Sequence, residues 1–60
     1  MTYVFEIYRD AKNEWRFRLI APNGRTIAVS GEGYKRRTSC LKTVRRIMEI
    51  AVTAAVKEKR

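Results

Sequence analysis

Large apolar and basic side chains alternate along one short segment, and this alternation constrains the fold more than any other feature of the chain. Between Glu14 and Ile20, the residues Trp15, Phe17 and Leu19 occupy every second position, and arginines stand between them. A period of two residues is typical of a β-strand with one face in the core and one in water. The sequence therefore predicts a strand that presents three large apolar side chains to a single face.

Two further segments carry the same signal, and turn residues separate them from the first. Tyr3 to Tyr8 and Arg25 to Ser30 are rich in β-branched or aromatic residues. The stretch Asp10 to Asn13 has turn chemistry, and Pro22-Asn23-Gly24 suits a three-residue hairpin loop in which glycine takes the left-handed position. These segments predict an antiparallel meander of three strands.

The two turns predict a register that gathers the apolar side chains on one face. The expected pairs are Leu19 with Ile27, Phe17 with Val29, Ile7 with Trp15, Phe5 with Phe17, and Tyr3 with Leu19. The apolar face then holds Tyr3, Phe5, Ile7, Trp15, Phe17, Leu19, Ile27 and Val29. The solvent face holds Val4, Glu6, Tyr8, Glu14, Arg16, Arg18, Thr26, Ala28 and Ser30, with the two glutamates expected to form ion pairs with arginines.

A helical pattern follows the predicted sheet. Cys40, Val44, Ile47 and Ala51 recur at the spacing of one helix face, while basic residues occupy the opposite side. The helix is expected to start between Arg36 and Ser39 and to lay its apolar stripe on the apolar face of the sheet. The predicted fold class is therefore α+β.

The C-terminal segment, Ile50 to Arg60, has no single interpretation. Its valines and Thr53 permit a strand, whereas its alanines and Lys-Glu pairs permit more helix, and neither glycine nor proline marks an end. Both possibilities stay open from the residues alone.

The small size of the chain favours self-association. A chain of 60 residues holds one domain, residues 1–60, and buries too little surface to be more than marginally stable. It has one cysteine and no histidine, so neither an internal disulfide nor a zinc site of histidine and cysteine ligands is expected. A homodimer is the remaining means of stabilisation. The lone thiol and the absence of a secretion signal or a long apolar stretch favour a cytoplasmic protein without a membrane partner.

Several short motifs in order resemble the YegP-like family of small bacterial and archaeal proteins. They are Phe5-Glu6-Ile7-Tyr8, Trp15-Arg16-Phe17-Arg18-Leu19, Ala21-Pro22-Asn23-Gly24, Ser30-Gly31-Glu32-Gly33-Tyr34-Lys35 and Ser39-Cys40. The resemblance implies a β-β-β-α-β unit, and a homodimer whose subunits share one sheet and exchange C-terminal strands. Ala54 to Glu58 is the segment that would be exchanged. The resemblance carries no biochemical function and no catalytic residues.

The sequence argues against an enzyme. Histidine, the commonest general base, is absent. Cys40 falls on the apolar helix stripe, where cysteine acts as a small hydrophobic residue. Gly31-x-Gly33 lacks the rest of a dinucleotide or phosphate-loop signature, so a turn is the expected structure there. We expect no catalytic residue, cofactor or metal.

Net charge gives the one functional lead. The chain carries +8 at pH 7, which favours binding to polyanions such as nucleic acid. A solvated basic surface without a ligand explains the same charge, so both interpretations stay open. The candidate contacts for nucleic acid or another anion are Tyr8, Arg16, Arg18, Lys35, Arg36, Arg37, Arg45 and Arg46.

Overall fold

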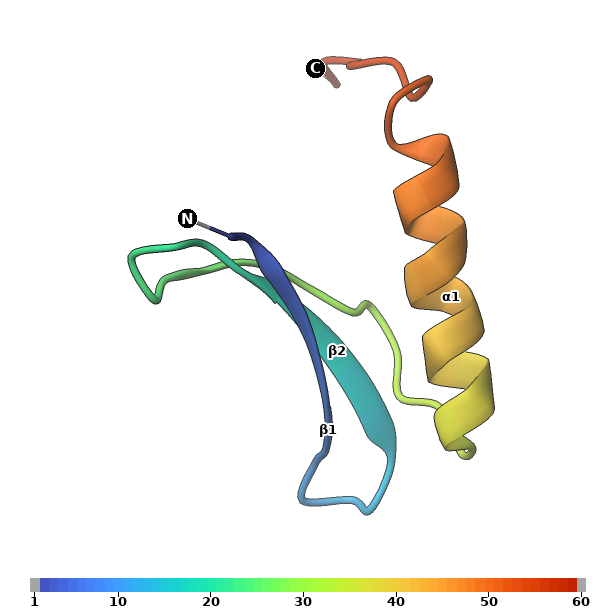
Figure 1. The fold of residues 1–60 in the computed structure, drawn as a ribbon. Helices are drawn as coiled ribbons and strands as arrows, with labels where there is room; N and C mark the ends of the chain where they lie inside the picture. The colour runs from blue at the N-terminus through green and yellow to red at the C-terminus, as the bar shows by residue number, and fades with distance from the viewer. Residues whose placement is uncertain (1, 60) are drawn as a thin grey trace.

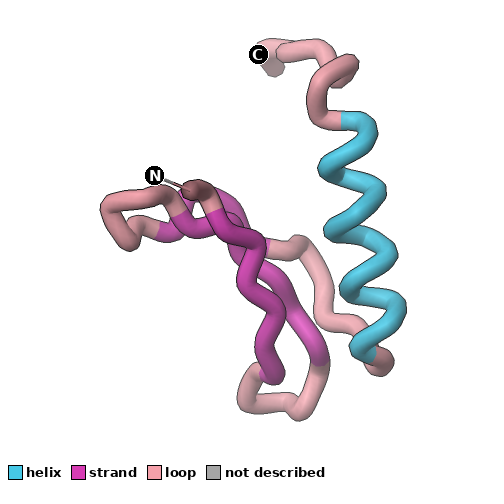
Figure 2. Tube along the Cα trace, in the orientation of Figure 1, coloured by secondary structure: helices cyan, strands magenta, loops and turns pink. Residues whose placement is uncertain are grey.

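Three antiparallel strands and one helix make up the fold, which we describe for residues 2–59 of a computed structural model. The strands are β1 (Val4–Arg9), β2 (Trp15–Ile20) and β3 (Thr26–Val29), in the order β1-β2-β3, and the helix is α1 (Arg37–Ile50). Figure 1 and Figure 2 show the helix standing beside one face of the curved sheet. The predicted α+β class, the meander and the single helix on one face are confirmed.

The first hairpin turns one residue later than the sequence predicted. Asp10 accepts the backbone N–H of Asn13 and donates its own to the carbonyl of Glu14, so residues 11–13 form the loop, with Asn13 at φ 65°. A three-residue loop of this kind ends on a left-handed residue, a conformation that asparagine tolerates. The register therefore moves by two residues, and Phe5 pairs with Leu19 and Ile7 with Phe17. The pairs predicted between β1 and β2 are wrong, but a shift of two leaves every side chain on its predicted face.

The second turn forms as predicted, and the strand after it does not. Gly24 has φ 87°, and Ala21 and Arg25 close the three-residue loop. Ile20 then pairs with Thr26, but the register shifts by one before Leu19 pairs with Ala28. Ile27 is the extra residue of this β-bulge, which places two residues of β3 opposite one of β2.

The bulge reverses the predicted faces of β3. Val29 lies opposite Arg18, and Ile27 and Val29 are 55% and 64% exposed rather than part of the core. Ala28 takes the face of Leu19, and Ser30, which was predicted to face solvent, is buried. A shift of one residue sends side chains to the opposite side of a sheet, so the predicted positions of these four residues are wrong.

The core lies between β2 and the first half of α1. Phe17, Cys40 and Val44 are buried, and five further apolar side chains pack around them: Phe5, Ile7, Trp15, Tyr34 and Ile47. Phe5 and Phe17 meet edge to face, with ring centroids 6.1 Å apart. The predicted stripe on the helix is confirmed for its first three members, and the helix starts at Arg37, inside the predicted window.

Both ends of the described chain differ from the predicted core. Tyr3 was predicted to face the helix, but it precedes β1 and is 61% exposed. The helix ends at Ile50, and Ala51 is its C-cap rather than a buried member of the stripe. Two turns follow, and residues 54–59 have neither helical nor strand structure within this single chain. Among residues 2–59, no helix has the length and hydropathy needed to cross a bilayer.

Candidate functional site

The solvent face of the sheet holds three of the predicted contact residues, and two of them are already paired. Arg18 donates from Nε to Glu6 Oε1 over 2.6 Å across the β1–β2 ladder, which confirms the predicted ion pair for Glu6. Its guanidinium also lies over the ring of Tyr8, 4.8 Å from the centroid. The chain's own arginine therefore covers one face of the aromatic ring that was expected to stack on a base.

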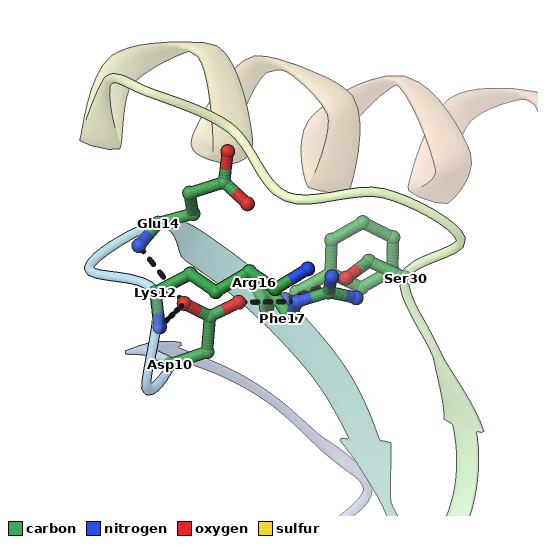
Figure 3. A network of polar contacts seen from close by, with 6 residues as sticks. All are labelled: Asp10, Lys12, Glu14, Arg16, Phe17 and Ser30. Atoms are coloured by element: carbon green, nitrogen blue, oxygen red, sulfur yellow. Dashed lines mark hydrogen bonds and ion pairs between the residues drawn. The ribbon is translucent and has the colours of Figure 1, made fainter.

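Arg16 is held by a turn residue. Its Nε donates to Asp10 Oδ2 over 2.6 Å, and Asp10 Oδ1 accepts the backbone N–H groups of Lys12 and Glu14 at 2.9 Å each (Figure 3). The hydrogen bond from the Glu14 backbone, followed by that from Arg16, lowers the pKa of Asp10 below its usual value. The same contact with Asp10 raises the pKa of Arg16. Arg16 is thus tied to the first hairpin turn through Asp10.

The other five predicted contacts belong to the helical layer. Lys35 and Arg36 precede α1, Arg37 begins it, and Arg45 and Arg46 lie further along it, all of them exposed. Because α1 packs on the sheet through Cys40 and Val44, its basic side points away from the sheet. The structure therefore does not bring the predicted residues together as one stripe: Arg16 and Arg18 lie on the outer face of the sheet, whereas Arg45 and Arg46 lie on the outer side of the helix.

Positive charge is concentrated in the helical layer. Residues 2–34, which build the sheet and its turns, contain five basic and four acidic residues. Residues 35–59, which build the helix and the tail, contain eight basic and two acidic residues. The start of α1 adds to this bias, since its first turn has no acidic residue and Arg36 makes no side-chain cap. Helix N-termini favour negative groups, so three cations there oppose the helix field.

An open groove of about 580 Å³ separates the second half of the helix from the sheet. Figure 1 shows α1 and the sheet diverging toward the C-terminal end of the helix. Exposed Ala28 of β3 and half-buried Ile47 of α1 lie on its two sides. Most of the residues that line the groove are apolar, and the full lining is Phe5, Phe17, Leu19, Ala28, Val29, Gly31, Glu32, Tyr34, Thr43 and Ile47. Beside it, β3 is an edge strand of the sheet.

Cys40 and the glycine pair occupy structural positions. The Cys40 side chain has no exposed surface, and burial raises the pKa of its thiol. Gly33 lies against Glu14, just before the bridge that joins Tyr34 to Trp15. Within residues 2–59, no group of three or more histidine, cysteine, aspartate or glutamate side chains is placed to hold a metal ion.

Sequence reasoning missed several contacts of the basic residues. Glu14 was expected to pair with an arginine, but Asp10 is the partner of Arg16. Arg9 lies over Trp15, 5.2 Å from the ring centroid. Lys42, on the solvent side of α1, was left out of the candidate contacts although its spacing from Arg45 and Arg46 places it beside them. The helical period of the basic residues is the signal that identifies Lys42.

This arrangement defines a small α+β domain with an open apolar groove and a basic helix. Residues 10–58 match the family model described as a domain of unknown function, DUF1508. The chain belongs to this family, the YegP-like or UPF0339 proteins of bacteria and archaea, which confirms the resemblance seen in the sequence.

Individual relatives agree with this assignment. A UPF0339 protein of Treponema denticola is 48% identical over 54 residues, which cover 90% of this chain and 91% of the relative. A UPF0339 protein of Stutzerimonas stutzeri is 47% identical over 51 residues, which cover 85% of this chain but 45% of the relative. A solution structure of a Haloferax volcanii protein has a TM-score of 0.90 and 33% identity, and the match covers 97% of both chains.

Proposed function

We propose that the protein is a non-catalytic homodimeric module with a structural or interaction role. In this proposal, residues 54–58 of each subunit pair with the β3 edge of the other, and the two sheets become one. The observation that carries the proposal is the apolar groove that lies beside a free strand edge. An unpaired edge presents backbone donors and acceptors that a strand from another chain can satisfy.

The C-terminal tail has the properties of such a strand. Val52 is 86% exposed and Val56 is 100% exposed, although both are apolar. No backbone hydrogen bond ties residues 55–59 to the rest of the described chain. Burying Val56 in the groove of a second copy would stabilise the pair by about 1.5–3 kcal/mol.

The length of one relative also supports two units. The match covers less than half of the Stutzerimonas stutzeri protein, which leaves room for a second unit in the same chain. Two units in one chain can bury the apolar groove in the same way as two chains in a dimer. The non-catalytic part of the proposal is supported by the complete burial of Cys40.

Light scattering tests the dimer directly. We expect a mass of about twice the 7.1 kDa of the chain, and a shift toward the single-chain mass for Val56→Asp, which places a charge in the groove. Val52→Asp is the matched control, because it removes an equally apolar exposed residue that precedes the pairing segment. Removing residues 53–60 should also lower the thermal midpoint. A wild-type mass of one chain, or equal dimerisation of the two aspartate variants, would contradict the proposal.

Nucleic-acid binding is the second candidate, and the uneven distribution of charge favours it. Eight of the fourteen basic residues lie in residues 35–59, beside only two acidic ones. The exposed ion pair between Arg46 and Glu49 neutralises only a small part of this positive charge. Such a surface attracts phosphate backbones and releases their counterions. Fluorescence anisotropy with labelled RNA and DNA tests this candidate. Binding should fall steeply with added salt, and no binding at low salt would refute it.

A further inference from the structure

The paired arginines of the sheet make its outer face a poor surface for nucleic acid. Arg16 is bound to Asp10, Arg18 is bound to Glu6, and Arg18 also covers Tyr8. A phosphate group that recruited either arginine would have to break an ion pair and expose a carboxylate beside itself. The sheet layer has one more basic residue than acidic residues, so it offers little net attraction.

The helix presents the opposite situation. Lys42, Arg45 and Arg46 stand within about 6 Å of axial rise, on the side of α1 that faces away from the core. Arg46 approaches Glu49 at 3.6 Å, but both side chains are about 70% exposed, at 72% and 69%. Exposed pairs of this kind are worth about 0.2–1 kcal/mol, so a phosphate can replace the glutamate.

We infer that this surface of α1, defined by Lys42, Arg45 and Arg46, contacts the phosphodiester backbone of double-stranded nucleic acid. The inference rests on the nucleic-acid binding proposed above, and it names the surface and the form of the ligand. It moves the contact from the sheet arginines, Arg16 and Arg18, to the helix, and it adds Lys42.

The chemistry of the helix selects a duplex over a single strand. Proteins that bind single strands gain about 1–3 kcal/mol per base by stacking bases on aromatic rings. Residues 37–50 contain no aromatic side chain, so α1 can only neutralise charge. Duplex DNA carries one charge per about 1.7 Å of its axis, which makes it the ligand with the larger counterion release.

An acidic membrane fits this surface less well than a duplex. Helices that bind bilayers bury an apolar face among the lipids. In α1 that face, formed by Cys40, Val44 and Ile47, is already packed on the sheet. Met48 and Ile50 are exposed, at 62% and 42%, but two residues apart they point to different sides of the helix and form no second apolar face.

Two double variants with the same loss of charge test the inference. Lys42→Gln/Arg45→Gln removes two cations from the helix surface, and Lys12→Gln/Arg25→Gln removes two exposed cations from the turns of the sheet layer. Anisotropy is measured with a labelled duplex and a labelled single strand of equal length over a series of salt concentrations. The slope of log K against log salt should fall by about 2 for the helix variant and remain unchanged for the turn variant. Wild type should bind the duplex more tightly.

The possible failures are distinguishable. No binding of wild type to either nucleic acid would remove the proposed binding function itself. Equal losses in the two variants would leave binding in place and overturn the assignment to α1. Tighter binding of the single strand, or binding to anionic lipid vesicles without binding to the duplex, would overturn the choice of ligand.

Discussion

Ser30 accepts a hydrogen bond at Oγ from the backbone N–H of Phe17, 3.3 Å away in the buried part of the sheet (Figure 3). The backbone N–H of Ser30 in turn donates to the carbonyl of Phe17 at 2.9 Å. Since Val29 ends β3, a side chain continues the pairing of β2 beyond the last ladder position. This contact allows the chain to leave the sheet without burying an unpaired donor.

Ser30→Ala should therefore destabilise the protein. The variant leaves the Phe17 N–H buried without this acceptor, which costs about 1–3 kcal/mol. Urea unfolding at a fixed protein concentration measures the loss, and Thr26→Ala, at an exposed position of β3, is the control. Equal effects of the two substitutions would show that the hydroxyl of Ser30 has no special role.

Asp10→Asn should weaken the fold at neutral pH and have little effect in acid. The pKa of Asp10 is lowered in the folded protein, so its ionised form stabilises the fold above the usual aspartate pKa of about 3.9. That contribution is lost as the pH falls through the lowered value. Thermal midpoints of both proteins between pH 2 and 7 should converge at the acid end. A difference that stays constant with pH would contradict the prediction.

Gly33→Ala should cost more than Gly31→Ala. A Cβ at Gly33 would meet Glu14 Oε1 at 2.5 Å and Glu14 Cβ at 2.9 Å, whereas a Cβ at Gly31 meets nothing within 4 Å. Relieving the overlap should cost about 1–3 kcal/mol. Gly31→Ala is expected to be neutral or slightly stabilising, because it restricts the unfolded chain. Thermal or urea unfolding of the two variants decides the matter, and the reverse order would refute it.

Cys40 should resist thiol reagents in the folded protein. Its side chain has no exposed surface and burial raises the pKa of the thiol, so little reactive thiolate meets the reagent. Labelling with a chromogenic disulfide at pH 8 should be slow in buffer and rapid in denaturant. Rapid labelling of the native protein would place Cys40 outside the core and restore a redox or nucleophilic role.

The elements of the fold followed from local patterns, but the pairing between them did not. The alternation around Phe17 and the helical spacing of Cys40 and Val44 each fix a face, and both predictions are confirmed. The first hairpin shifted because Asn13, which the sequence only marked as a turn residue, takes the left-handed position. No residue pattern predicted that Ile27 is the extra residue of a β-bulge, since isoleucine suits a regular strand as well as a bulge.

The sequence predicted basic residues for the candidate site, but it did not predict how they are arranged in space. Sequence period separated the arginines of the sheet from those of the helix, and the structure places Arg45 and Arg46 on the opposite side from Arg16 and Arg18. The pairing of Arg16 with Asp10 depends on the folded turn, which brings the two side chains within 2.6 Å. Whether a charge is free or already bound is therefore a tertiary property, and counting basic residues in the sequence does not reveal it.

The bulge at Ile27 joins two strand registers that a regular β-ladder cannot hold together. The loop at Pro22–Gly24 sets one phase for β3, in which Thr26 faces Ile20, while the buried hydroxyl of Ser30 requires the other. The one extra residue makes up the difference of one between the two registers. The geometry of the hairpin loop therefore does not dictate the geometry of the segment that leads to the helix. Loop exchanges at the tip should consequently leave the entry into α1 undisturbed, provided that they preserve the spacing up to this insertion.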